Sequence, residues 1–116
     1  MLQKEPFTEE RPWGNFRQFS SGVPVAVKIV FVRRGEALSL QTHKWRSEFW
    51  VILKGNPEVT IGQNTTQGSE GGEFVIPKNT AHRLSAPEED VRFLELSFGK
   101  FDEGDIERLE DKYGRA

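Results

Sequence analysis

The fold of this 116-residue chain is decided by residues 35–55, which read GEALSLQTHKWRSEFWVILKG. The segment ends in an apolar run, residues 49–53, which is typical of a buried strand. If residues 37–43 form a strand before it, their side chains alternate between two faces. Three polar side chains then share one face: Ser39, Gln41 and His43. Such a face either meets water outside the domain or lines a polar interior.

Outward from this segment, the middle of the chain consists of short strand-like runs separated by turns. The most regular is VAVKIVFV at residues 25–32, which is rich in β-branched residues and stops at Arg33, Arg34 and Gly35. Other runs of this kind lie at residues 49–53, 58–61, 73–76 and 91–98. Gly, Pro and Asn clusters separate them, and no helical pattern intervenes. The pattern predicts an all-β antiparallel barrel or sandwich, in one domain over residues 1–116.

One helix is predicted, and it is at the C-terminal end. From Asp105 onward, Ile106, Leu109 and Tyr113 recur at three- and four-residue steps. Acidic residues begin the segment and Gly114 follows it, as expected of helix ends. We expect this helix to lay an apolar stripe across one side of the barrel.

Composition excludes several classes of function. The net charge is -2, so nothing favours nucleic acid or an anionic membrane as partner. The chain has no cysteine, which excludes disulfides and thiolate metal sites. Residues 1–14 lack the apolar core of a secretory signal, and no apolar run approaches the ~20 residues of a membrane span. We therefore expect a cytoplasmic protein.

Four side chains in these segments form a candidate metal site. Glu48 lies five residues after His43, so a turn at residues 44–47 would bring it back beside the imidazole. His82 is the only other histidine, and Gln41 completes a set of two nitrogen and two oxygen donors. Such donors suit zinc, iron, cobalt, nickel or manganese, and a bound ion could polarise a carbonyl oxygen. On spacing alone, a half-exposed strand with polar alternation remains the alternative.

Several motifs, in a fixed order, resemble a known family. They are RPWG at residues 11–14, LSLQTH at 38–43 followed by Arg46, Glu48 and Trp50, Ile76-Pro77 with His82-Arg83, and DIERLEDKYGR at 105–115. Together they resemble the C-terminal phosphomannose isomerase domain of type II mannose-6-phosphate isomerases, within the cupin superfamily. The resemblance covers nearly the whole chain.

The resemblance implies a double-stranded β-helix, the cupin or jelly-roll barrel, with the C-terminal helix added. It implies one divalent ion, zinc first, held by Gln41, His43, Glu48 and His82. It also implies a metal-dependent aldose-ketose isomerase that converts mannose 6-phosphate to fructose 6-phosphate. In bifunctional members a guanylyltransferase domain precedes this one. Since these residues contain no guanylyltransferase domain, we expect an isomerase that acts alone and does not synthesise GDP-mannose.

Two charged residues within apolar strands are candidates for catalysis. Lys28 shares a face with Ala26, Val30 and Val32, so it lies either at a solvent edge or in a wet site, where it would contact substrate. Glu95 lies in the middle of a strand, where a carboxylate is costly unless it is paired. Glu95 or Lys28 would move the proton between two carbons. The alternative for Glu95 is an outward polar position.

Other candidates concern the substrate. Arg46, between two predicted metal ligands, is a further candidate catalytic residue that could reach the substrate, or it could pair with an outer carboxylate. Ser39 would face the barrel interior, where it is expected to contact substrate. Arg11 is expected to lie across the barrel mouth, where it would contact phosphate or serve the structure. Arg108 and Arg115 are expected to pair with acidic neighbours around the terminal helix.

Two other functions remain open at this point. One is a non-catalytic cupin that binds a sugar phosphate or nucleotide sugar, and the other is a different metal-dependent cupin enzyme, such as an iron oxygenase. The expected small-molecule partner is a sugar phosphate. Because an edge strand near the N-terminus needs to be covered, we also expect a homodimer.

Overall fold

The computed structural model describes residues 6–99 and 104–111, and in these ranges every regular element is a strand. In chain order the strands are β1 (Phe7–Arg11), β2 (Gly14–Gln18), β3 (Val25–Val32), β4 (Leu40–Thr42), β5 (Arg46–Lys54), β6 (Glu58–Ile61), β7 (Asn64–Gln67), β8 (Glu73–Ile76), β9 (His82–Ser85), β10 (Val91–Gly99) and β11 (Glu107–Glu110). The predicted all-β class is confirmed. In the described part of the chain there is no helix long and apolar enough to cross a membrane.

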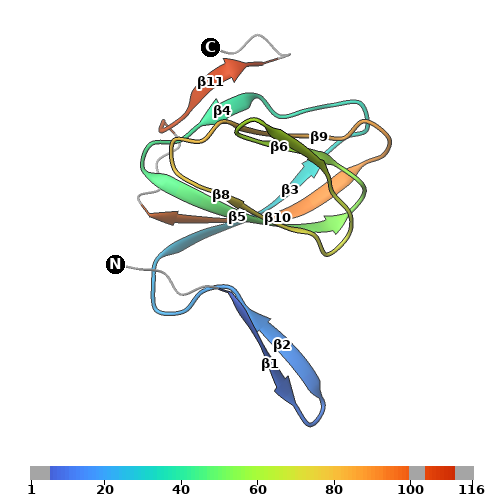
Figure 1. The fold of residues 1–116 in the computed structure, drawn as a ribbon, viewed down its shortest axis with the longest axis vertical. Helices are drawn as coiled ribbons and strands as arrows, with labels where there is room; N and C mark the ends of the chain where they lie inside the picture. Colours follow the sequence, from blue (N-terminus) through green and yellow to red (C-terminus); the bar gives the residue numbers. More distant parts are fainter. Residues whose placement is uncertain (1–5, 100–103, 112–116) are drawn as a thin grey trace.

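Two antiparallel sheets face each other and enclose the interior (Figure 1). The four-stranded sheet has the order β3-β10-β5-β8, and the five-stranded sheet has the order β11-β4-β9-β6-β7. Strands β1 and β2 form a separate hairpin that stands away from the two sheets (Figure 1). Since most connected strands alternate between sheets, residues distant in sequence meet across the interior.

The inner face of the four-stranded sheet changes from apolar to polar along its strands. At one end Val32, Ile52 and Phe93 belong to a core cluster and are almost fully buried. Because side chains alternate, the next inward positions on β10 are Glu95 and Ser97, and both are buried as well. The apolar end contributes burial free energy to the fold, as does a second buried cluster of Phe49, Leu96 and Phe98. The polar end forms a potential site.

The segment before His43 is not the continuous strand that alternation predicts. Ala37 pairs with Ser85 in an isolated bridge, whereas Gln41 pairs with His82 in β4 and β9. Between these two pairs the segment from Ala37 to Gln41 advances by four residues, whereas the partner segment from His82 to Ser85 advances by three. The extra residue makes a β-bulge. The extra residue lets Leu38 pack against the apolar core while Gln41 stays on the inner, polar face with His82.

The predicted C-terminal helix is wrong over the residues described there. Residues 107–110 form β11, which pairs with β4 through Glu107 opposite Thr42 and Arg108 opposite Gln41. Without β11, this edge of β4 would present unpaired backbone groups, so tertiary pairing overrides the local helical pattern. The remainder of the predicted helix, residues 112–116, lies outside the described residues.

The predicted place of Arg11 across the barrel mouth is also wrong. Arg11 ends β1 and Gly14 begins β2, so RPWG forms the turn at the tip of the projecting hairpin (Figure 1). Arg11 pairs with Glu9 of the same hairpin, and Trp13 is 74% exposed. The motif makes a turn because a proline at its second position favours one.

Candidate metal centre

Three buried side chains from three parts of the chain converge at the polar end of the barrel. His43 follows β4, Glu48 lies in β5 and His82 begins β9. The Nε2 atom of His43 is 3.3 Å from Glu48 Oε2, and that of His82 is 4.0 Å from Glu48 Oε1. One possible ligand atom from each residue lies within 4.8 Å of the others. This group could hold a metal ion.

Backbone carbonyl groups fix the tautomer of both histidines. His43 Nδ1 lies 2.6 Å from the carbonyl oxygen of Asp105, and His82 Nδ1 lies 2.8 Å from that of Thr80. A carbonyl can only accept, so each Nδ1 carries a proton, and the neutral tautomer that fits this contact has its lone pair on Nε2. Burial lowers the pKa of His82, which favours the neutral ring. Neutral imidazoles with Nε2 directed at a carboxylate are in the form that a divalent ion requires.

Glu48 is held from both sides by donors. Trp50 Nε1 donates to Oε1 at 2.9 Å, and Arg46 Nε donates to Oε2 at 3.1 Å. Arg46 also places a terminal nitrogen 3.3 Å from His43 Nε2, consistent with a lone pair there. The guanidinium group therefore orients two candidate ligands, and the predicted contact of Arg46 with substrate stays a prediction.

Gln41, the fourth predicted ligand, lies next to this group. It is directly opposite His82 in the β4–β9 pair, so the two side chains project from the same face. Its amide nitrogen donates a long bond of 3.4 Å to the carbonyl oxygen of Ser39. Ser39 itself is buried at the bulge. Ligation by Gln41 and substrate contact by Ser39 both stay predictions.

Glu95 and Lys28 lie side by side on the opposite sheet. In the β3–β10 pair they are directly opposite each other, and Trp50 of β5 is the other neighbour of Glu95. Burial, with repulsion from Glu48, raises the pKa of Glu95 to about 7, although Lys28 and Arg46 oppose the shift. Glu95 is thus a buried carboxyl group that exchanges its proton near neutral pH.

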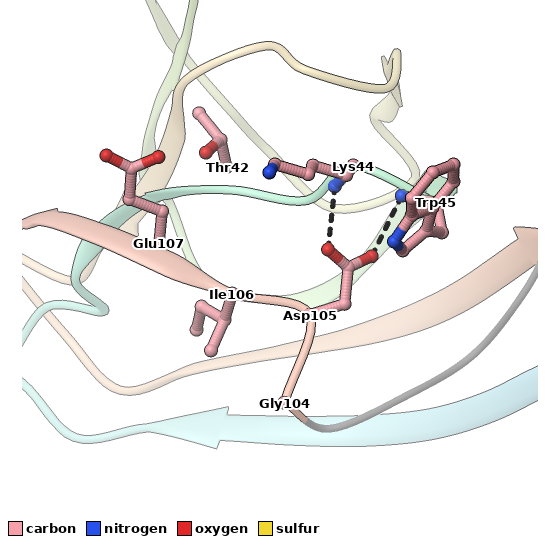
Figure 2. A pocket seen from close by; sticks show the side chains of 7 residues that line it. All are labelled: Thr42, Lys44, Trp45, Gly104, Asp105, Ile106 and Glu107. Carbon is pink, nitrogen blue, oxygen red and sulfur yellow. Dashed lines mark hydrogen bonds between the residues drawn. The ribbon is translucent and has the colours of Figure 1, made fainter.

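Asp105 is a residue of the site that the sequence analysis missed. Its backbone carbonyl accepts from His43, and its carboxylate accepts from the amides of Lys44 and Trp45 at 2.9 and 2.8 Å (Figure 2). Desolvation pushes its pKa up, but the two amide bonds outweigh it, so the pKa is lowered. Asp105 borders a cavity of about 430 Å³ lined also by Thr42, Lys44, Trp45, Gly104, Ile106 and Glu107. It therefore fixes both the turn after β4 and the ring of His43.

Loss of either histidine should remove metal binding. We expect zinc to raise the melting temperature of the wild-type protein and to bind in a 1:1 ratio by calorimetry, because an ion that binds only the folded state stabilises it. His43→Ala and His82→Ala should each abolish both effects. Glu58→Ala, which removes an exposed carboxylate, is the control and should retain both. Stoichiometric zinc in both histidine variants would contradict the site.

Glu95 should make the metal-free protein less stable as the pH rises. The folded-state pKa of about 7 lies above the ordinary value of 4.5, so the stabilisation from a protonated Glu95 is complete below about pH 4.5 and is lost as the pH rises through 7. The full effect is about 3 kcal/mol. Glu95→Gln should lack this loss between pH 5 and 8 in urea unfolding with chelator present. Parallel pH profiles for the two proteins would show that Glu95 has an ordinary pKa.

Comparison with known proteins agrees with this geometry. Residues 3–111 match the family model described as mannose-6-phosphate isomerase C-terminal. The alginate biosynthesis protein AlgA of Pseudomonas putida is 38% identical over 108 residues, which are 91% of this chain and 22% of that protein. A mannose-1-phosphate guanylyltransferase of Salmonella typhimurium, RfbM, is 37% identical over 106 residues, 90% of this chain and 22% of the relative. The chain thus spans less than a quarter of the length of these relatives.

A solved structure supports the fold. A cupin protein from Bacteroides fragilis superposes with a TM-score of 0.61 at 22% identity, covering 65% of each chain. At this identity the likeness shows the fold alone, and it confirms the predicted cupin barrel.

The predicted function, a stand-alone isomerase of hexose 6-phosphates, is corrected by these comparisons. The activity printed for RfbM is guanylyl transfer, and this chain corresponds to only 22% of such a protein. The relatives are therefore enzymes and biosynthesis proteins that share this domain, and isomerisation of mannose 6-phosphate does not follow as the function of the protein. Because the family model matches residues 3–111, this chain belongs to the family of mannose-6-phosphate isomerase C-terminal domains.

Proposed function

We propose that this chain is a metal-dependent cupin enzyme domain that transfers a proton on an anionic sugar ligand. The observation that carries the proposal is the pair of buried histidines, His43 and His82, whose Nδ1 atoms are bonded to backbone carbonyls and whose Nε2 atoms face the buried carboxylate of Glu48. An acid–base group, Glu95, lies in the same interior. This combination fits an enzyme of the isomerase-like type named by the family.

The metal would be held by His43, Glu48 and His82, with Gln41 as the fourth ligand. Two imidazoles, a carboxylate and an amide oxygen suit zinc first, with iron, manganese, cobalt and nickel as alternatives. When bound, a divalent ion supplies a Lewis acid that polarises an oxygen of the ligand. Arg46, Trp50 and Asp105 keep the protein ligands in place through their hydrogen bonds to Glu48 and His43.

Glu95 would serve as the group that accepts and returns a proton. A pKa of about 7 means that both of its protonation states are populated at neutral pH. Lys28, directly opposite in β3, would favour the carboxylate form and contact a ligand oxygen. General acid–base catalysis of this kind contributes roughly 10²–10⁴-fold in rate.

A sugar phosphate is the proposed ligand class. Glu48 is the one carboxylate of the proposed ligand set, so a divalent ion would leave the centre positively charged. Lys28 adds a positive charge beside it, and Glu95 is about half neutral at pH 7. An anionic, oxygen-rich ligand fits this balance of charge.

Proton transfer can be tested directly by solvent exchange. The zinc-loaded protein should incorporate deuterium from heavy water into the carbon next to the carbonyl carbon of a sugar phosphate, followed by NMR over a panel of aldose and ketose phosphates. Glu95→Gln should abolish exchange and leave zinc and ligand affinity nearly unchanged. Thr65→Ala, at an exposed position of β7, is the control. Tight binding without exchange across the panel would overturn the enzymatic proposal.

We also propose a homodimer and keep the cytoplasm as the proposed location. In the described residues β3 is an edge strand that pairs with β10. Its outer face is apolar and is exposed by 36–62% at Val25, Val27, Ile29 and Phe31. Because this row carries no charge, it is complementary to itself across a two-fold axis. A second copy would cover both the edge and the apolar row.

A charge placed on this row should separate the subunits. Wild-type protein is expected to be a dimer by light scattering, and Ile29→Lys should be a monomer, because a buried unpaired ammonium is costly at an interface. Val75→Lys on β8, at the other edge of the sheet, is the matched control and should remain a dimer. A wild-type mass that stays monomeric at all concentrations would contradict the dimer.

A further inference from the structure

The five-stranded sheet places an arginine in line with the metal centre. Arg108 of β11 is opposite Gln41 of β4, and Gln41 is opposite His82 of β9. Side chains directly opposite in antiparallel strands project from the same face, so all three share the face that His82 directs into the barrel. Neighbouring strands are about 4.8 Å apart, so Arg108 starts about 10 Å from His82, within reach of a ligand bound at the metal.

One donor of the Arg108 guanidinium group is not satisfied by the described residues. Its Nε atom is buried, and within residues 6–99 and 104–111 it has no hydrogen-bond partner. An arginine cannot escape this by losing its proton. A buried donor without a partner is costly, and the cost is removed when a ligand supplies an acceptor.

Three other candidate cations are already engaged or are elsewhere. Arg46 donates to Glu48 and contacts His43. Lys28 lies opposite Glu95 on the other sheet. Arg11 is on the projecting hairpin, where it pairs with Glu9. Arg108, by contrast, is aligned with Gln41 and His82 on their own sheet.

We propose that Arg108 binds the phosphate group of the ligand at the metal centre. The inference rests on the proposed function, since it assumes a ligand that reaches the ion with one oxygen. The planar fork of a guanidinium matches two phosphate oxygens at once, and Nε takes part in such a fork. The substrate class is accordingly a phosphate monoester whose sugar oxygens lie on the side of His82 and Glu95.

This assignment corrects the role that the sequence suggested for Arg108. A helix would have placed the residue among acidic neighbours outside the barrel. In β11 the register shifts between Arg108 and Glu110, so Arg108 is opposite Gln41 whereas Glu110 is opposite Leu40, whose side chain projects from the other face of β4. Glu110 contacts Arg83 of β9 at 3.5 Å. The irregularity in β11 therefore leaves Arg108 on the inner face and Glu110 on the outer face.

The test is the affinity of the zinc-loaded protein for mannose 6-phosphate as probe, measured by calorimetry. Arg108→Met should weaken it by roughly 10- to 150-fold, the range for one lost charge-assisted hydrogen bond. Arg108→Lys should recover part of the loss, and zinc affinity should be the same in all three proteins. Arg83→Met is the matched control, because Arg83 also has a buried Nε without a partner in the described residues but lies on the outer face. It should bind the probe like wild type.

The outcomes separate this inference from the proposed function. Equal probe affinity for Arg108→Met and wild type, or no binding to wild type, would overturn the role of Arg108. Weaker binding to Arg108→Met than to Arg83→Met supports it, even if no sugar phosphate exchanges deuterium. Exchange in wild type with unchanged affinity in Arg108→Met would keep the enzymatic proposal and discard the phosphate site.

Discussion

The buried carboxylate of Glu48 is the constraint on which the rest of the site depends. Its side chain is 2% exposed, and an isolated charge at such a position would cost several kcal/mol. Trp50 and Arg46 compensate by donating to one oxygen each. Trp50 in turn packs on Phe93 at 4.8 Å and on His82 at 5.8 Å between ring centroids. The indole of Trp50 therefore connects the candidate metal centre with the hydrophobic core, because it contacts Glu48 and His82 as well as Phe93.

The position of the site follows from the register of the four-stranded sheet. Glu48 is opposite Ser97, and the next inward pair is Trp50 with Glu95. Beyond these, Ile52 and Phe93 belong to the core. A slip of one residue would turn every polar side chain outward and apolar ones inward, so burial of the core fixes the site as well. The same pairing explains why the fold tolerates the buried Glu95 carboxyl group, whose pKa is about 7. Its strand, β10, is held in place by the apolar residues Val91 and Phe93 in the core.

The sequence predicts most of the barrel, because short strands carry their own pattern and turns. Runs such as residues 58–61 and 73–76 are strands with the expected bounds. It also brings together His43, Glu48 and His82, whose residue types suit a metal. The sequence could not reveal the role of Asp105, because its contacts are made with His43, Lys44 and Trp45, about 60 residues earlier in the chain. These contacts involve its backbone carbonyl and two backbone amides, which leave no pattern in the sequence. Nor could it reveal the bulge before Gln41, which exists only through pairing with β9.

The wrongly predicted helix is instructive because the strand that replaces it serves the site. A helix over residues 105–113 would satisfy its own backbone groups and would leave β4 with an open edge. As a strand, the segment closes that edge and at the same time supplies the carbonyl that orients His43. It also aligns Arg108 with Gln41 and His82 on the inner face. Helix propensity contributes at most a few tenths of a kcal/mol per residue to the stability of a helix here. The strand instead satisfies the backbone groups of β4 and holds the ring of His43, and each such hydrogen bond contributes about as much or more. The conformation of this segment is therefore decided by its pairing with β4 and its contact with His43, and the periodicity of Ile106 and Leu109 has little influence on it.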